Sequence, residues 1–250
     1  MIDIEKAKKE MEKYILTFDQ DNPKIANKKR HTFSVLNISI QLSKDLKLDE
    51  ENTKLAEIIA LLHDIGRFEQ LKKYDSCMDY KTIDHGDLGV EILSKNDFIR
   101  NFIEDDKYDD IIFKAIKNHN KFKIEEGLNK IELLHCQIIR DCDKLDNYYK
   151  EARIEHIITK NEKISDKIYN DYKEEKSLNK QDIENEIDYI LLCCAWIFDY
   201  NFKESYKIIK RDNLINRLFD QIKESNEETK NKLEELRKIS HEYVDKKILS

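Results

Sequence analysis

The sequence predicts an all-α protein, on three observations. Its 250 residues include four Gly and one Pro, where average usage would give roughly 17 and 12. β-Sandwiches and barrels need these residues in their turns, so the composition disfavours both folds. Apolar residues recur at helical spacing, while sustained alternation is scarce. Neither G-x-G-x-x-G nor G-x-x-x-x-G-K occurs, which excludes the glycine-cradled nucleotide folds.

The periodicity predicts three helices before residue 66. The first covers residues 4–18 and ends before the only proline turn, and the second covers residues 27–46. Asp49 is the predicted N-cap of the third, with two glutamates in its first turn, where negative charge favours the helix dipole. That helix extends to Asp64, and Gly66 is predicted as its C′ residue.

The remainder of the chain is also predicted to be helical, apart from two stretches. Residues 67–82 look irregular, and residues 160–180 are polar enough for a loop. The helices expected here cover 84–94, 108–120, a stretch from about 130 past Asp143, and segments centred on 187–209, 214–222 and 230–244. We therefore expect a helical core over residues 1–160. A helical extension over residues 161–250 would pack on it to form one globular unit.

Charge and cysteine usage restrict the partners and the compartment. Lys plus Arg number 45 and Asp plus Glu 52, a net charge of −7, so double-stranded nucleic acid is not an expected partner. The basic cluster Lys28-Lys29-Arg30 is interpreted as a solvated helix face. No apolar run is long enough to span a membrane, and no signal peptide is evident. Five cysteines without C-x-x-C spacing suit small core residues in a reducing cytoplasm.

Four polar residues lie on apolar stripes of four different predicted helices: His31, His63, His119 and Asp143. Their neighbours at helical spacing are mostly aliphatic. A buried imidazole or carboxylate is costly unless it is paired or binds a metal. Convergence on one cation explains all four residues, whereas the alternative requires a separate internal hydrogen-bond partner for each.

The glycines indicate the same region. Gly66, Gly86 and Gly89 are three of only four glycines, and each follows a candidate ligand, His63 or His85, within four residues. In a chain that otherwise avoids glycine, this clustering predicts a close approach of backbones around a site.

Six residues carry a resemblance to a known family: His31, His63, Asp64, His85, His119 and Asp143. In this order they resemble the H…HD…H…H…D pattern of the HD-domain metal-dependent phosphohydrolase superfamily, over roughly residues 27–150. His63 and Asp64 stand in Leu-Leu-His-Asp-Ile-Gly-Arg. The segment Arg-Asp-Cys-Asp-Lys-Leu is similar to the family's A-D-[KR]-L helix, and this similarity selects Asp143 over Asp141.

The resemblance implies a helical bundle around one or two divalent metal ions. His31, His63, Asp64 and Asp143 match the basic single-metal set. His85 and His119 match the additional histidines of two-metal members, with Asp64 bridging, so a dinuclear site is favoured. Two alternatives remain open: His85 held only by hydrogen bonds, and His119 contacting phosphate. Mixed nitrogen and oxygen ligands suit Mn, Fe, Co, Ni or Zn.

The implied activity is hydrolysis of a phosphate ester, a mono- or diester of a small molecule, and a nucleotide is the expected substrate class. Asp64, Arg67 and Lys144 are the predicted catalytic residues, and Arg67, Lys144 and Asn147 the predicted substrate contacts. Alternatively, Arg67 is an exposed loop residue and Lys144 pairs with a nearby acid. A homodimer formed through the C-terminal helices stays open.

Departures from known branches leave the substrate open. Guanosine tetra- and pentaphosphate hydrolases and deoxynucleotide 5′-nucleotidases have an acidic residue where Arg67 stands. Cyclic-di-GMP phosphodiesterases have a lysine there, but their Gly-Tyr-Pro motif is excluded because the only proline is Pro23. A di-iron oxygenase with the same ligand pattern is one alternative class. A non-catalytic nucleotide-binding module is another, and the intact set of six ligands argues against it.

Overall fold

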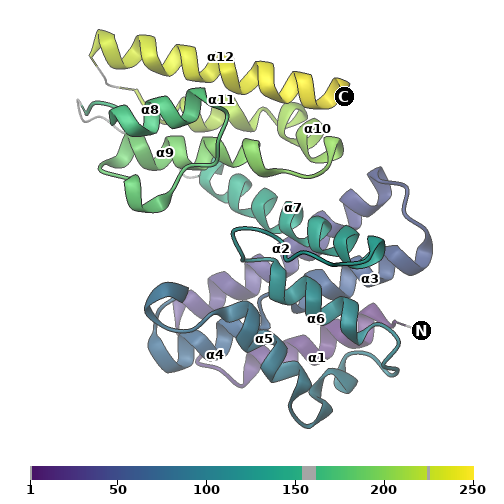
Figure 1. Ribbon diagram of the computed structural model, residues 1–250. Coiled ribbons are helices and arrows are strands. Elements are labelled where there is room, and N and C mark those ends of the chain that lie inside the picture. The colour runs from purple at the N-terminus through teal and green to yellow at the C-terminus, as the bar shows by residue number, and fades with distance from the viewer. Residues whose placement is uncertain (1, 154–161, 224–225) are drawn as a thin grey trace. The chain divides into compact units, whose positions relative to one another are not determined.

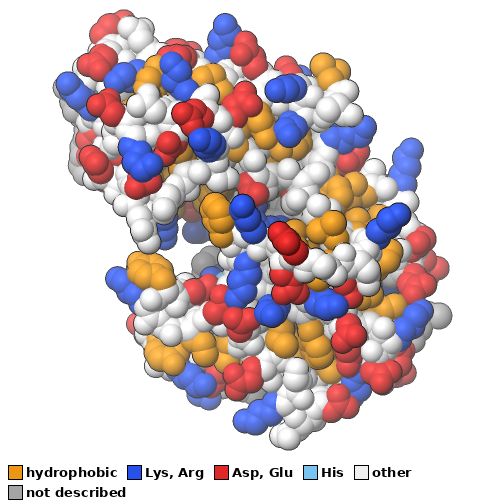
Figure 2. All heavy atoms as spheres, in the orientation of Figure 1, with side chains coloured by type: hydrophobic (Ala, Val, Ile, Leu, Met, Phe, Trp, Pro, Cys, Tyr) orange, Lys and Arg blue, Asp and Glu red, His pale blue; other side chains and the backbone are white. Residues whose placement is uncertain are grey.

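The computed structural model describes residues 2–153, 162–223 and 226–250, and every regular element within them is a helix (Figure 1). The predicted all-α class is therefore confirmed. The chain divides into two compact units, Met1–Asp143 and Lys144–Ser250. Among the residues described, no helix combines the length and the apolar character needed to cross a bilayer. Figure 2 shows acidic and basic side chains intermixed over the face in view.

The first unit contains six complete α-helices, two 3₁₀ helices and the first part of a seventh α-helix. They are α1 (Ile4–Leu16), α2 (Pro23–Asp45), α3 (Glu50–Leu62), α4 (Ile65–Tyr74), η1 (Asp79–Lys81), α5 (His85–Ser94), η2 (Lys95–Asn101), α6 (Asp109–Asn118) and α7 (Lys130–Arg153). Asp49 caps α3 as predicted, because its carboxylate accepts a hydrogen bond from the backbone N–H of Asn52 at 2.7 Å.

Helix α3 lies deep in the first unit. Every residue from Leu55 to Leu62 is buried, including the carboxylate-bearing Glu57. This helix packs on α1, α2 and α6, while α5 packs on α4 and α6 (Figure 1). Burial of each large aliphatic side chain contributes about 1.5–3 kcal/mol. The central position of α3 means that the residue at its C-terminal end enters the interior of the unit.

Two sequence expectations are wrong at helix α4: Gly66 does not end α3, and residues 67–74 of the stretch expected to be irregular are helical. Gly66 is the second residue of α4, and its role is packing. A Cβ atom there would lie 2.3 Å from the carbonyl oxygen of His85 and 2.8 Å from the backbone nitrogen of Gly89. The close backbone approach predicted from the clustered glycines is confirmed, since a Cβ at Gly86 would also lie 2.9 Å from the carbonyl oxygen of Ile116.

The second unit is also helical. It contains the end of α7, then α8 (Asp166–Lys173), η3 (Lys180–Asp182), α9 (Glu186–Cys194), η4 (Ala195–Asp199), α10 (Lys203–Arg211), α11 (Leu214–Phe219) and α12 (Glu227–Leu249). Helix α12 packs on α8, α10 and α11. The stripe that includes Ile190, Cys193, Cys194 and Ile197 is buried, which confirms its interpretation as core packing.

Three expectations need correction, two about the helices of the second unit and one about Cys77 of the first unit. The expected loop over 160–180 contains α8, which forms because Ile168 and Tyr172, one turn apart, are both buried. The helix expected over 187–209 is broken between η4 and α10, where the hydroxyl of Tyr206 donates to the carbonyl oxygen of Tyr200 at 3.1 Å. Cys77 is exposed, while the other four cysteines are buried. The expected boundary between residues 160 and 161 touches residues 154–161, outside the described part of the chain.

Candidate metal centre

The six predicted ligands come from six different helices or helix ends of the first unit. His31 lies on α2, His63 at the end of α3, Asp64 before α4, His85 at the start of α5, His119 at the end of α6 and Asp143 on α7. All are at most 5 % exposed, except Asp143, whose side chain is 23 % exposed. Residues separated by more than 100 positions in the sequence therefore meet in the interior.

The carboxylate of Asp64 is shared by two groups of imidazoles. Its Oδ2 atom lies 3.5 Å from Nε2 of His31 and 3.8 Å from Nε2 of His63. Its Oδ1 atom lies 3.3 Å from Nε2 of His85 and 3.7 Å from Nε2 of His119. Each oxygen thus faces one pair of histidines.

The remaining distances fit the donor set of a metal site. Nε2 of His31 lies 3.1 Å from Oδ1 of Asp143, and Nε2 of His85 lies 2.9 Å from Nε2 of His119. The donor atoms of His31, His63 and Asp64 all lie within 4.8 Å of one another, as do those of Asp64, His85 and His119. Ligands about 2.0–2.2 Å from an ion are separated by comparable distances, so the residues present fit one or two divalent cations.

Hydrogen bonds orient the rings so that Nε2 faces the centre. Nδ1–H of His63 donates to the carbonyl oxygen of Ala60 at 2.8 Å, and Nδ1–H of His119 donates to that of Ile116 at 2.6 Å. A carbonyl oxygen can only accept, so the proton of each ring is on Nδ1 and the lone pair of Nε2 is available to a cation.

The electrostatics also favour cation binding. Burial lowers the pKa of His63 to about 3, so its ring is neutral at pH 7. Burial alone would raise the pKa of Asp64, but the Lys28 ammonium and the adjacent imidazoles outweigh this effect and hold the pKa well below its usual value. For Asp143, burial is likewise opposed and outweighed by His31, which lowers the pKa. His63, Asp64 and Asp143 are therefore in the protonation states that metal binding requires. At His85 burial is outweighed by the hydrogen bonds to Asp64 and Asp79, which raise the pKa, so a cation bound there displaces a proton.

Lys28 is a member of the site that the sequence analysis assigned to a solvated face, and that interpretation is wrong. Its ammonium donates to Oδ2 of Asp64 at 2.7 Å, and its side chain is only 17 % exposed. Lys28 precedes His31 by three residues on α2, so both lie on the same face of the helix. That spacing could have identified it.

Arg67 lies beside the centre, on α4. Its Nε atom is 3.7 Å from Oδ1 of Asp64, and its side chain is 14 % exposed. Nη1 donates to Oδ1 of Asp79 at 2.6 Å and to the carbonyl oxygen of Cys77 at 2.7 Å. The alternative interpretation of Arg67 as an exposed loop residue is therefore wrong, and its contact with phosphate stays a prediction.

Lys144 and Asn147 belong to the second unit. The ammonium of Lys144 donates to the carbonyl oxygen of Asp199 at 2.8 Å and also to the carboxylate of that residue. Lys144 therefore pairs with a nearby acid, which is one of the two alternatives stated for it above. Asn147 is half-buried on α7, four residues after Asp143. Substrate contacts by both residues remain predictions.

Two further residues of the centre were missed by the sequence analysis. Asp79, on η1, accepts a hydrogen bond at Oδ2 from Nδ1–H of His85 at 2.7 Å. Arg140 donates to the carbonyl oxygens of Asn118, at 3.1 Å, and Lys121, and thereby fixes the backbone around His119. Arg140 lies on the predicted helix of Asp143, but no sequence signal singles out Asp79.

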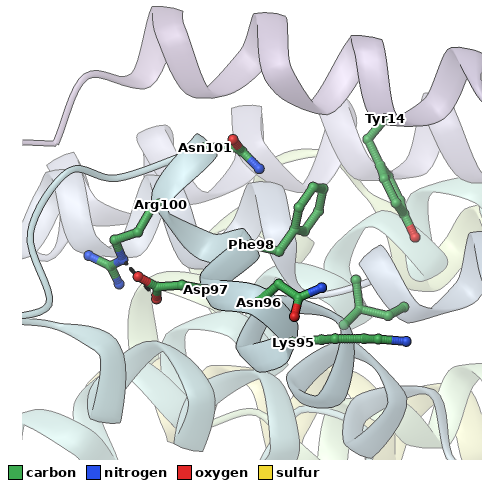
Figure 3. Close-up of a pocket in the computed structure, with 8 residues that line it drawn as sticks. Tyr14, Lys95, Asn96, Asp97, Phe98, Arg100 and Asn101 are labelled. Atoms are coloured by element: carbon green, nitrogen blue, oxygen red, sulfur yellow. Dashed lines mark ion pairs between the residues drawn. The ribbon is translucent and has the colours of Figure 1, made fainter.

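A separate cavity of about 620 Å³ lies where α1 faces the junction of α5 and η2 (Figure 3). Tyr14, Lys95 and Phe98 contribute to its lining, and Nε of Arg100 lies 3.4 Å from Oδ1 of Asp97 at its edge (Figure 3). None of the six predicted ligands lines this cavity, so it is not part of the candidate centre.

Comparison with known families gives one match. Residues 29–148 match the family model described as HD domain. This range contains all six predicted ligands. The chain has no match among curated proteins or solved structures.

Proposed function

Because residues 29–148 form an HD domain, we propose that the chain is a metal-dependent phosphohydrolase. Its expected substrate is a small-molecule phosphate ester, and nucleotides are the first class to examine. The observation that carries the proposal is the shared carboxylate of Asp64, with one oxygen toward His31 and His63 and the other toward His85 and His119. Such a carboxylate can bridge two cations.

The proposed chemistry divides between the ions and the protein. When bound, divalent ions lower the pKa of water and compensate the charge of a phosphoryl group. The histidines and carboxylates hold those ions, with the ring protons kept on Nδ1 of His63 and His119. The identity of the metal is open among Mn, Fe, Co, Ni and Zn.

Two cationic side chains support a phosphate substrate. Lys28 and Arg67 both lie beside Asp64, with Nζ at 2.7 Å from Oδ2 and Nε at 3.7 Å from Oδ1. Phosphoryl transfer depends mainly on positioning and charge compensation. We assign Lys28 and Arg67 to the binding of phosphoryl oxygens. The reducing cytoplasm that the cysteine usage predicts is the proposed compartment.

The test is a hydrolysis screen over nucleotides and other phosphate esters with Mn²⁺, comparing wild type, Asp64→Asn and the control Asp45→Asn, a half-buried acid at the end of α2 that is not one of the predicted ligands. We expect phosphate release by wild type and the control, and none by Asp64→Asn. Equal inertness of all three proteins would favour a non-catalytic module. Substrate-dependent O₂ uptake without phosphate release would instead establish the oxygenase alternative.

A further inference from the structure

We propose that Asp79 is a positioning residue of this centre, which fixes the ring of His85 and the guanidinium of Arg67 with one carboxylate. The inference rests on the proposed function, because it assigns a role within the same site. It concerns a residue outside the H…HD…H…H…D pattern. Asp79 lies on the short helix η1.

His85 needs a hydrogen-bond acceptor that its own helix does not provide. The rings of His63 and His119 donate to carbonyl oxygens three residues earlier, within the preceding helical turn. His85 is the first residue of α5, so it has no preceding turn. Oδ2 of Asp79 takes that place at 2.7 Å from Nδ1. A carboxylate accepts and thus keeps the proton on Nδ1, and Nε2 then faces Asp64 and His119.

The other oxygen of the same carboxylate restrains Arg67. Oδ1 of Asp79 accepts from Nη1 of Arg67 at 2.6 Å, while Nε of Arg67 faces Asp64 at 3.7 Å. Asp79 therefore contacts one predicted metal ligand and one predicted phosphate contact. Its position sets the relative placement of both.

Hydrogen bonds from two neighbouring segments, rather than packing, hold Asp79 in place. Helix η1 has no buried residue. The fully buried Gln70 donates from Nε2 to Oδ1 of Asp79 at 3.0 Å and to the carbonyl oxygen of Ile83 at 2.9 Å. Asn120, just after α6, donates to Oδ2 of Asp79 at 3.2 Å. A carboxylate on a segment without buried residues, aimed inward by several donors, fits a positioning role.

The role predicts a selective effect on metal binding. Removing a hydrogen-bond partner of a metal-binding histidine typically costs 10–100-fold in metal affinity. Loss of the Asp79 carboxylate should weaken the half of the centre formed by His85 and His119 by this factor. The half formed by His31 and His63 does not contact Asp79 and should keep its affinity.

The experiment compares wild type, Asp79→Asn, Asp79→Ala and the control Asp87→Asn. Asp87 is an acid on α5 whose side chain is 52 % exposed and pairs with Lys121 at 2.9 Å. Calorimetric Mn²⁺ titration measures both affinities. The ¹⁵N chemical shifts of the His85 ring report its tautomer in metal-free protein, at a pH above the raised pKa of this ring, where it is neutral. Asp79→Asn preserves the shape of the side chain, so it keeps the test open if Asp79→Ala unfolds.

We expect two Mn²⁺ ions on wild type and the control, with one of the two sites 10–100-fold weaker in Asp79→Asn. We also expect the Nδ1–H tautomer of His85 to give way to a mixture when the carboxylate is removed. Unchanged affinities together with an unchanged tautomer would overturn the inference. Failure of wild type to bind Mn²⁺ would refute the proposed function instead, and the tautomer measurement would then decide the role of Asp79 by itself.

Discussion

Substitution of Gly66 by Ala tests how the centre is assembled, because this position sets the distance between α4 and α5. A Cβ atom at Gly66 would lie 2.3 Å from the carbonyl oxygen of His85, about 1 Å inside ordinary contact. Overpacking costs about 1–3 kcal/mol, whereas Ala in place of a helical Gly returns about 1 kcal/mol. Because the opposing atom belongs to the backbone and cannot rotate away, we expect the packing cost to reach the upper end of its range, which leaves a net destabilisation of about 2 kcal/mol.

Gly89→Ala is the matched control. Its nearest new contact is Cγ2 of Ile116 at 3.3 Å, a side-chain atom that can yield. The packing cost and the gain in helix propensity should then cancel to within about 1 kcal/mol. Urea unfolding measures both free energies, and Mn²⁺ titration should show weaker binding in Gly66→Ala because His85 moves. If Gly66→Ala were as stable as wild type, the close approach of α4 and α5 would be refuted.

Three further predictions concern a cation, a histidine and a thiol. Lys28→Ala should lower phosphate release about 100-fold, as loss of a preorganised donor does, while the exposed control Arg30→Ala should not; equal rates would remove Lys28 from the site. Burial lowers the pKa of His135 to about 4, so the folded protein holds this ring neutral. The free energy of unfolding should therefore fall by up to about 3 kcal/mol as the pH falls from about 6.5 to about 4. His135→Gln should flatten that part of the stability profile, and an unchanged slope would contradict this. Cys77 is exposed while the other cysteines are buried, so a thiol reagent should modify one cysteine of the folded protein, and Cys77→Ser should abolish this labelling. Labelling of further thiols would show that the core opens.

Much of the fold could be predicted from local sequence signals. The Asp49 cap and the apolar periodicity place α3 correctly because both act within one helix. Helix α4 was missed because Gly66 resembles a helix terminator, and only the contact with His85, 19 residues later, reveals its role. Helix α8 was missed because its burial rests on Ile168 and Tyr172 amid polar neighbours.

The candidate site could be predicted as far as residue type and helical face allow. His31, His63, His119 and Asp143 occupy apolar stripes, and their convergence follows from the cost of burying them unpaired. The helical face places Lys28 beside His31 but does not reveal its contact with Asp64, and Asp79 could not be found from its face at all. Their partners, Asp64 and His85, lie 36 and 6 residues away across helix boundaries, and such contacts depend on the tertiary fold.

The proposed function requires that the two oxygens of Asp64 bind two cations. Anomalous diffraction from crystals grown with Mn²⁺ tests it most directly. We expect two peaks, one between Asp64 and the pair His31 and His63, and the other between Asp64 and the pair His85 and His119. Well-ordered crystals with no anomalous peak in contact with Asp64 would contradict it.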